Sequence, residues 1–160
     1  MGNAIGSVVF FLVAPGTVMV FLPLLAGLWR MEPPLLGIEA ARYVGVVLVL
    51  AAPVALVDSF VRFAREGRGT PFPGAPPERL VVRGAYRWVR NPMYVAIVTT
   101  LVGESLVFGN EDLFFYAAIV FAAFHIFVVT YEEPALRAQF GAEYDAYRAR
   151  VPRWIPRRPS

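Results

Sequence analysis

Residues 93–131 read MYVAIVTTLVGESLVFGNEDLFFYAAIVFAAFHIFVVTY, and this stretch decides the fold. Two apolar segments, Met93–Phe108 and Leu113–Tyr131, flank the polar turn Gly109–Asp112. Apolar segments of this length separated by a short turn predict a transmembrane hairpin over 93–131. The first segment is the shorter one and contains an acidic residue, Glu104.

Two further apolar segments precede the hairpin. Ala4–Leu28 contains no charged residue and is long enough to cross a bilayer, and Ile38–Val57 follows with Arg42 near its start, where the side chain can snorkel to the interface. No positively charged region and no small-residue cleavage site accompany the first segment, so we expect a retained helix and not a signal peptide. Pro15-Gly16 and Pro23 should bend it.

Composition supports the same fold class. Of the 160 residues 58% are hydrophobic, and the mean hydropathy is +0.56. We therefore predict an all-α, polytopic membrane helix bundle of about four transmembrane helices, formed by one membrane domain over residues 1–160. Residues 1–57 supply the two N-terminal transmembrane helices. The absence of cysteine excludes disulfides and thiolate nucleophiles, and with a single histidine we expect no metal site.

Charge bias in the loops predicts the orientation. All fifteen basic residues are arginines, and most lie in residues 58–92 and after Tyr131, whereas the turn Gly109–Asp112 has none. The positive-inside rule places the 58–92 loop and residues 132–160 in the cytosol, and four crossings place the N-terminus there too. Arginine-only usage hints at a bacterial source, so we predict an integral protein of the bacterial inner membrane with both termini cytosolic.

The cytosolic segments have different character. Residues 67–77 are rich in Gly and Pro, and whether they form a lid stays open. Glu132-Glu133-Pro134 predicts a helix start, since acids and proline suit a first turn. An apolar face follows, formed by Leu136, Phe140, Tyr144, Tyr147 and Val151. This face predicts one amphipathic cytosolic helix that lies along the membrane or packs on residues 78–92.

Arg83–Tyr94 and the pair Glu132 and Glu133 are candidates for chemistry. Arginines with Trp88 and tyrosines can form an interfacial belt against headgroups. Alternatively, Gly84 permits close approach of a ligand, and Asn91-Pro92 leaves backbone N–H groups free at a helix entry. The two glutamates either compensate a helix dipole or direct one carboxylate into a cytosolic cleft, where it accepts hydrogen bonds from ribose hydroxyls, an adenine amino group or an ammonium.

Glu104 and His125 are ionisable residues inside apolar segments and so are functional candidates. Counting residues from the segment ends places them roughly 9 Å apart along the membrane normal, which argues against a direct pair. Their roles stay open at this stage.

Five motifs in order resemble the isoprenylcysteine carboxyl methyltransferase family and its phospholipid methyltransferase relatives. The matching motifs are Gly84-Ala85-Tyr86, Arg90-Asn91-Pro92-Met93-Tyr94, Glu132-Glu133-Pro134-Ala135-Leu136, Phe140-Gly141-Ala142-Glu143-Tyr144-Asp145-Ala146-Tyr147 and Val151-Pro152. They span roughly residues 78–156, about half of the chain. Each motif is weak alone, but their order and spacing across a membrane hairpin are specific.

The resemblance implies a cytosolic S-adenosylmethionine site between residues 78–94 and the segment that follows the hairpin. Mapped onto this chain, the implied cofactor contacts are Glu78, Arg79, Leu80, Val81, Tyr86, Asn91, Pro92, Met93, Tyr94, Glu132 and Glu133. Aromatic faces suit the sulfonium cation of this cofactor. The catalytic candidates are Glu133, Glu132 and Tyr94.

Two departures from the family pattern concern the acceptor. Asn91 stands where the prenylcysteine enzymes have histidine, and no cation lies in Ile126–Tyr131, where they have an arginine thought to hold a substrate carboxylate. We therefore predict methyl transfer to a lipophilic acceptor from the bilayer whose identity stays open. A carboxylate acceptor needs no base, whereas an amine or hydroxyl needs one, for which Glu132, Glu133 and His125 are candidates.

Two other functions remain possible from the sequence, an NADPH-dependent membrane reductase of related architecture and a non-enzymatic lipid-binding protein. In each case the expected partners include membrane lipids and no nucleic acid. The sequence leaves the oligomeric state open.

Overall fold

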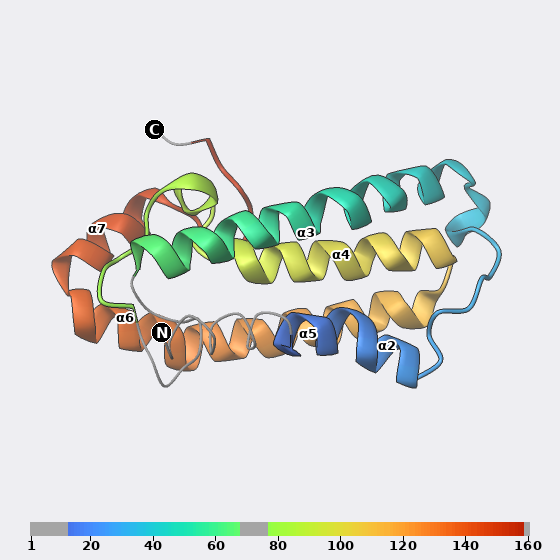
Figure 1. Ribbon diagram of the computed structural model, residues 1–160, viewed down its shortest axis with the longest axis horizontal. Coiled ribbons are helices and arrows are strands. Elements are labelled where there is room, and N and C mark those ends of the chain that lie inside the picture. The colour runs from blue at the N-terminus through green and yellow to red at the C-terminus, as the bar shows by residue number, and fades with distance from the viewer. Residues whose placement is uncertain (1–12, 68–76, 159–160) are drawn as a thin grey trace.

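The computed structural model describes residues 13–67 and 77–158, and every regular element in these ranges is helical (Figure 1). The N-terminal helix Val13–Leu25 contains the π-helical turn η1 (Thr17–Phe21) and α2 (Leu22–Leu25). The further elements are η2 (Leu35–Gly37), α3 (Ala40–Glu66), η3 (Gly84–Arg87), α4 (Pro92–Phe108), α5 (Glu111–Phe127), η4 (Val128–Glu132), α6 (Glu133–Phe140) and α7 (Ala142–Arg150). The all-α prediction is confirmed.

The long helices form a bundle, and α6 and α7 lie at one end of it (Figure 1). Two continuous helices, Ala40–Glu66 and Glu111–Phe140, are long and apolar enough to cross a membrane, while Val13–Leu25 and Pro92–Phe108 are apolar but shorter. Helix is therefore present at all four predicted segments, and the count of four crossings stays a prediction. Residues 4–12 of the first segment, and most of the 67–77 segment considered as a lid, lie outside the described residues.

Helix α3 continues to Glu66, nine residues beyond the predicted end of its apolar segment at Val57, so the first part of the predicted 58–92 loop is helical. Arg62 explains the extension, because it pairs with Asp58 at 2.8 Å and with Glu66 at 3.7 Å, each four residues away on the same helix face. Ser59 and Phe60 are buried in this extension, so tertiary packing adds to the local pairs. The extension brings α3 to the end of the bundle that holds α6 and α7 (Figure 1).

Glycines set the close packing of α3 against α4. A Cβ atom on Gly45 would lie 2.7 Å from the carbonyl oxygen of Gly103, and one on Gly103 would lie 2.9 Å from Cβ of Leu48. Small residues at such a crossing let two backbones approach closely, as is common between membrane helices. Around this contact Leu56, Ala96, Ile97, Leu101, Ala117 and Val120 form the buried core of the bundle.

The turn between α4 and α5 lies where it was predicted but is shorter, because α5 begins at Glu111 and not at Leu113. Gly109 ends α4 with φ 71°, a left-handed conformation that favours glycine. Asn110 then caps α5, since its side-chain oxygen accepts from the backbone N–H groups of Asp112 at 2.8 Å and Leu113 at 3.4 Å. Its amide nitrogen donates to the carbonyl of Leu28 at 2.9 Å and so ties the turn to the N-terminal helix.

The predicted helix start at Glu132-Glu133-Pro134 is wrong, because α5 continues through the π-helical turn η4 into α6. Pro134 has no N–H to donate to the preceding turn, and its ring would clash with a regular α-helical carbonyl there. A π-helical turn widens the backbone at this point, and such turns are frequent at functional sites. The two glutamates therefore lie within a continuous helix and compensate no free helix end.

The single amphipathic tail helix is also corrected. Gly141, with φ 52° and ψ −124°, separates α6 from α7. The predicted apolar face nevertheless stays together, because Tyr144, Tyr147 and Val151 form a buried cluster against which Leu80, Leu136 and Phe140 pack. Of the two predicted placements, the structure therefore has the face packed on the 78–92 segment.

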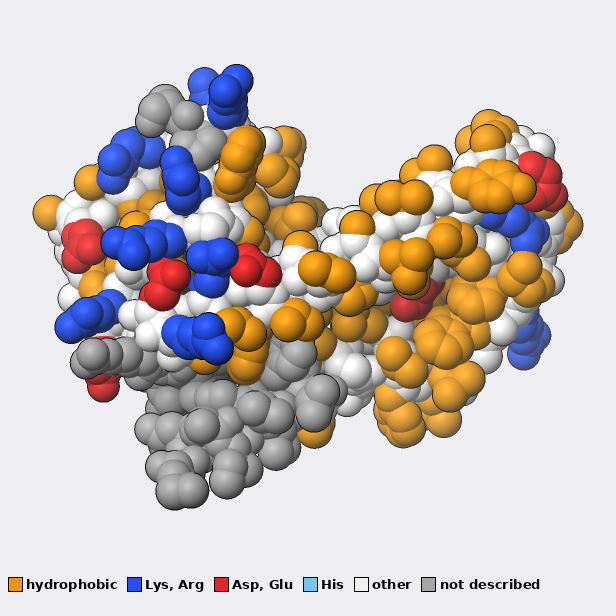
Figure 2. Space-filling model, turned by 45° about the horizontal axis from the view of Figure 1, so that its top comes forward, with side chains coloured by type: hydrophobic (Ala, Val, Ile, Leu, Met, Phe, Trp, Pro, Cys, Tyr) orange, Lys and Arg blue, Asp and Glu red, His pale blue; other side chains and the backbone are white. Residues whose placement is uncertain are grey.

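Charged and apolar side chains are segregated along the molecule. Figure 2 shows most of its arginine and acidic side chains over the end that holds α6 and α7, a smaller charged group at the opposite end, and mainly hydrophobic side chains over the described surface between them. The outward-facing residues of α3 are apolar, with Val47, Leu50 and Val54 each more than 60% exposed. Such a surface suits contact with lipid, in agreement with membrane association.

Candidate active site

A cavity of about 250 Å³ lies at the charged end of the bundle. Its walls come from α3, the segment 77–94, the end of the continuous helix Glu111–Phe140, and α7. The lining residues are Phe63, Pro77, Leu80, Val81, Tyr86, Arg90, Asn91, Met93, Tyr94, Phe127, Tyr131, Glu132, Glu133, Ala135, Leu136, Gln139, Tyr144 and Tyr147. The two segments singled out in the sequence thus meet around one cavity.

Tyr94 and Glu132 form a hydrogen-bonded pair on the cavity wall. The Tyr94 hydroxyl donates to Oε2 of Glu132 at 2.9 Å, and the Tyr94 ring packs against Phe124 with a centroid separation of 4.6 Å. The π-helical turn η4 ends at Glu132, so this turn sets where the carboxylate points. Glu132 has no ion pair within the described ranges, which leaves its charge available to a ligand.

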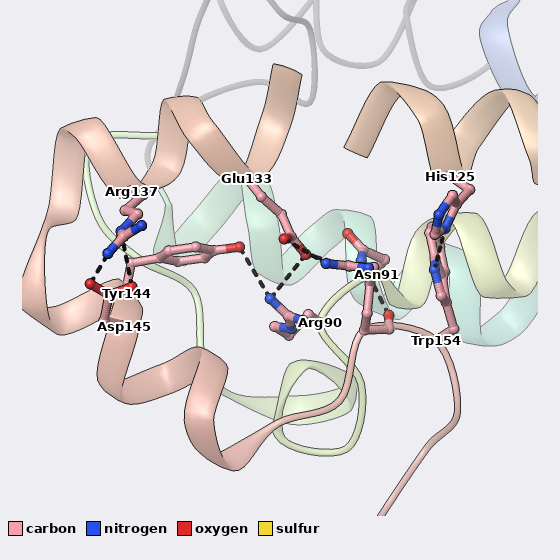
Figure 3. A network of polar contacts seen from close by, with 9 residues as sticks. Arg90, Asn91, His125, Glu133, Arg137, Tyr144, Asp145 and Trp154 are labelled. Carbon is pink, nitrogen blue, oxygen red and sulfur yellow. Dashed lines mark hydrogen bonds and ion pairs between the residues drawn. The ribbon is translucent and has the colours of Figure 1, made fainter. Parts of the chain in front are cut away.

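Glu133 has different surroundings, as Figure 3 shows. Arg153 donates from Nε to Oε1 at 2.7 Å and from Nη2 to Oε2 at 2.9 Å, and Arg90 Nη1 lies 2.9 Å from Oε1. Arg90 Nη1 also donates to the Tyr144 hydroxyl at 3.4 Å. Both oxygens of Glu133 are thus engaged by guanidinium groups, an arrangement that fixes the carboxylate and neutralises its charge. The geometry supports Glu133 as a positioning residue more than as a catalytic one.

Tyr86 presents a buried hydroxyl to the cavity without a partner in the described structure. The residue is 6% exposed, and burial raises the pKa of its hydroxyl well above the usual value, so the group is neutral. Its backbone carbonyl accepts a 2.8 Å hydrogen bond from the Tyr147 hydroxyl, which fixes the residue in place. A buried hydroxyl without a partner is costly, and a ligand in this cavity could supply one.

Gly84 makes room for a side chain of the protein itself, and not for the ligand that the sequence suggested. Its φ is +59°, and the Arg62 side chain occupies the space that a Cβ atom would need. Gly84 therefore lets the extended α3 pack against η3. Asn91 likewise serves the fold, since its side-chain nitrogen donates to the Arg153 carbonyl at 3.1 Å while the residue lines the cavity.

The predicted site residues separate into two groups. Leu80, Val81, Tyr86, Asn91, Met93, Tyr94, Glu132 and Glu133 line the cavity. Glu78, Arg79 and Pro92 are not in its lining. Glu78 and Arg79 are exposed, and their backbone N–H groups donate to the Gly67 carbonyl at 2.8 and 3.3 Å. Pro92 is the buried first residue of α4. The predicted cofactor contacts of these three residues have no support in this arrangement.

Several cavity residues were absent from the predicted site. Arg90 could have been included from its place in the Arg-Asn-Pro motif, and Tyr144 and Tyr147 from the predicted apolar face. Arg153 is not in the cavity lining but holds Glu133, and it carried no local signal, because a contact across twenty residues depends on the fold. Gln139 also faces the cavity, and its side chain donates to the Pro77 carbonyl at 2.7 Å.

A short C-terminal segment, residues 152–157, completes the site from outside. The Arg90 N–H donates to the Pro152 carbonyl, and the Arg157 N–H to the Trp88 carbonyl, each at 2.9 Å. Trp154 donates from Nε1 to Nδ1 of His125 at 3.0 Å (Figure 3). His125 is therefore held by the tail and is not part of the cavity lining. Glu104 accepts from Trp29, so the two residues have separate partners, as their predicted depths indicated.

Comparison with known proteins gives a family match that includes all cavity residues except Tyr144 and Tyr147. The phospholipid methyltransferase family matches this chain over residues 40–143. A protein-S-isoprenylcysteine O-methyltransferase of Schizosaccharomyces pombe is 35% identical over 77 residues, which is 48% of this chain and 33% of that protein. Protein-S-isoprenylcysteine O-methyltransferase B of Arabidopsis thaliana is 32% identical over 78 residues, 49% of this chain and 40% of that protein. The matched segments span well under half of either relative.

Proposed function

The chain belongs to the phospholipid methyltransferase family, and from this premise we propose that it transfers a methyl group from S-adenosylmethionine to a lipophilic acceptor. The observation that carries the proposal is the single cavity that joins residues 77–94 to the segment after the hairpin. Within the described ranges it has a carboxylate without an ion pair, a buried hydroxyl without a partner and several aromatic rings.

The residues on the cavity wall fit the chemistry of S-adenosylmethionine. A sulfonium cation is attracted to aromatic faces, which Tyr86, Tyr94 and Tyr147 supply. Ribose hydroxyls and an ammonium are hydrogen-bond donors that suit the Glu132 carboxylate. The Tyr86 hydroxyl, as a donor and an acceptor, has no competing partner among the described residues. Glu133 would act indirectly, by holding Arg90 and Arg153 in place.

When bound, the cofactor supplies an electrophilic methyl group. Methyl transfer is an in-line displacement, so the protein contributes mainly by aligning the two reactants and excluding water. The cavity walls are largely apolar, with Leu80, Val81 and Phe127 beside the polar groups, which favours exclusion of water. Where the acceptor is an amine or hydroxyl, Glu132 is the candidate base, because His125 lies outside the cavity and Glu133 is held by two arginines.

The acceptor would enter from the bilayer, and the cavity would face the cytosol. The charged end that holds α6 and α7 carries most of the arginines, which supports a cytosolic position by the positive-inside rule (Figure 2). On this basis we propose that both termini are cytosolic, and the arginine-only composition supports the proposal of a bacterial inner membrane. We do not propose isoprenylcysteine, which the names of the two relatives mention, as the acceptor of this protein, because no arginine lies in Ile126–Tyr131.

Calorimetric titration of the purified full chain tests the proposal. Binding of S-adenosylmethionine and S-adenosylhomocysteine, without binding of NADPH, is the expected result. Binding of NADPH alone would favour a reductase, and binding of none of the three would favour a lipid-binding protein. Transfer of labelled methyl groups into an organic extract of membranes then checks the reaction and isolates the acceptor.

A matched pair of variants assigns the binding to this cavity. Glu132→Gln removes the cavity charge with little change in size, and Glu143→Gln removes a charge from an exposed position on α7. We expect a loss of affinity of at least tenfold in Glu132→Gln and none in Glu143→Gln. Equal affinity in the two variants would place the cofactor elsewhere.

A further inference from the structure

A second pocket lies between the N-terminal helix, α3 and α4, with a volume of about 450 Å³. Its walls are almost wholly apolar side chains. They are contributed by Met19, Val20, Trp29, Val46, Val49, Leu50, Pro53, Thr100, Val107 and Phe108, and Glu104 completes the lining. None of these residues lines the cavity described above.

The two pockets occupy different levels of the bundle. Glu104 follows Tyr94 by ten residues on α4, which separates them by roughly 15 Å along the helix axis at about 1.5 Å per residue. Tyr94 lies at the end of α4 beside α6, whereas Glu104 lies toward the Gly109 turn. A ligand in the second pocket would therefore lie in the other half of the bundle.

Glu104 is a buried carboxylate in this apolar setting. It is 6% exposed, and the hydrogen bond that it accepts within the described residues comes from Nε1 of Trp29, at 3.2 Å to Oε2. The Trp29 ring stacks on Phe108 with a centroid separation of 5.8 Å and an interplanar angle of 13°, so the indole is held in place. Only one of the two carboxylate oxygens is engaged in this way.

No cation offsets the charge of Glu104 in the part of the chain that the structure describes. Arg42 and Arg30 make contacts with other residues. Arg42 pairs with Glu39 at 3.6 Å and donates a hydrogen bond to the Glu32 carbonyl, and the Arg30 side chain lies against Gly27. A carboxylate inside an apolar segment is costly to insert, and such residues usually serve a ligand or an ion path. The arrangement is a long apolar pocket with one anionic group on its wall.

We propose that this pocket binds a lipophilic amine, with the ammonium group at Glu104 and the hydrocarbon tail along Val46, Val49 and Leu50 of α3. An ammonium would offset the carboxylate charge and donate to its remaining oxygen. An alcohol with the same tail would fill the pocket but leave the charge uncompensated, and an anionic lipid would be repelled. The proposal is independent of methyl transfer and of the first cavity.

Native mass spectrometry tests this proposal. It measures how much dodecylamine stays bound to the full chain after release from micelles of a neutral maltoside detergent. We expect one dodecylamine per chain, with dodecanol and laurate binding at least tenfold more weakly. Glu104→Gln keeps an acceptor for Trp29 but removes the charge, and should weaken dodecylamine binding at least tenfold. Glu111→Gln, a charge removed from the exposed start of α5, should change nothing. Equal binding in the wild type and Glu104→Gln would overturn the proposal.

A second variant covers the case in which Glu104→Gln fails to fold. Val46→Phe narrows the pocket without changing Glu104 or Trp29, and should also weaken dodecylamine binding at least tenfold. Unchanged dodecylamine binding in Val46→Phe would contradict this pocket as the binding site. Equal binding of dodecanol and dodecylamine would contradict the contact between the ammonium group and Glu104. Titration of S-adenosylhomocysteine in the same variants reads out the first cavity separately, so the failure of either proposal can be recognised.

Discussion

Arg153 holds Glu133 through two hydrogen bonds, at 2.7 Å from Nε to Oε1 and 2.9 Å from Nη2 to Oε2. The adjacent carboxylate, Glu132, instead accepts from the Tyr94 hydroxyl on the cavity wall. Two consecutive glutamates of one motif thus have different surroundings, one neutralised by arginines and one available to a ligand. This division leads to the first two predictions.

Glu133→Gln should destabilise the protein. The substitution leaves Arg90 and Arg153 without their shared carboxylate, and breaking a buried ion pair costs about 3 kcal/mol, less where one partner is partly exposed. We expect a clear fall in Tm of the purified protein, whereas exposed Glu143→Gln should change stability by less than about 0.5 kcal/mol. Equal Tm values for the two variants would show that the ion pair contributes little.

Tyr94→Phe should weaken cofactor binding while the protein stays folded. The variant loses the hydroxyl that orients Glu132, and a hydrogen bond to a charged group contributes about 1.5–3 kcal/mol, or roughly 10- to 100-fold in affinity. Calorimetry with S-adenosylhomocysteine measures the change. Tyr43→Phe alters a tyrosine that is 75% exposed on α3 and serves as the matched control, with affinity unchanged. Wild-type affinity in Tyr94→Phe would remove Tyr94 from the proposed site.

Tyr86→Phe should weaken cofactor binding without destabilising the ligand-free protein. The Tyr86 hydroxyl is buried and has no partner among the described residues, so its removal is expected to leave the ligand-free protein as stable or more stable, by about 1 kcal/mol, while affinity for S-adenosylhomocysteine falls. Tyr147→Phe is the contrasting variant, since it removes a donor to the Tyr86 carbonyl and should lower Tm. A large loss of stability in ligand-free Tyr86→Phe would mean that the hydroxyl serves the fold.

Gly45→Ala should force α3 away from α4. The added Cβ atom would lie 2.7 Å from the Gly103 carbonyl oxygen, so the helix backbones must shift, at a cost of about 1–3 kcal/mol. Thermal unfolding in detergent measures the loss. Gly16→Ala is the control, because a Cβ atom there meets nothing within 4 Å. The proposed contact would be contradicted if both variants unfolded at the same temperature.

The orientation can be tested directly, because the chain has no cysteine. Single cysteines placed at Glu143, on α7, and at Glu111, at the hairpin turn, should label from opposite sides of the membrane. We expect an impermeant maleimide to label Glu111→Cys in intact bacterial cells and Glu143→Cys only after permeabilisation. The reverse pattern would place the cavity outside the cytosol.

Much of the fold could be predicted because its signals are local. Apolar segments bounded by charged residues locate the helices, and the turn Gly109–Asp112 locates the hairpin. Motif order also identified the two segments that meet at the cavity, including Tyr86, Tyr94 and Glu132. The helices and the turn depend on residues within a few turns of each other along the chain, where composition and spacing carry most of the information, whereas the pairing of the two cavity segments came from the family resemblance.

Two predictions about the backbone after the hairpin were wrong, because local sequence signals there indicate more than one structure. Acids and proline at 132–134 resemble a helix start, but the preceding helix continues through a π-helical turn that accommodates Pro134. Gly141 lies between Phe140 and Tyr144 of the predicted apolar face, and the periodicity of that face gives no sign that the backbone will turn there. In both places a pattern of side chains was correct and the backbone path was not.

The sequence by itself determined the helix class, the hairpin and the arginine-rich end of this protein, since hydropathy and charge act residue by residue. Only the tertiary structure decided which of the two glutamates is held in an ion pair among the described residues, because that depends on Arg90 and Arg153 reaching Glu133 from distant segments. It likewise paired Trp29 with Glu104 and Trp154 with His125. Such contacts join residues whose separation along the chain carries no periodic signal, so packing alone brings them together.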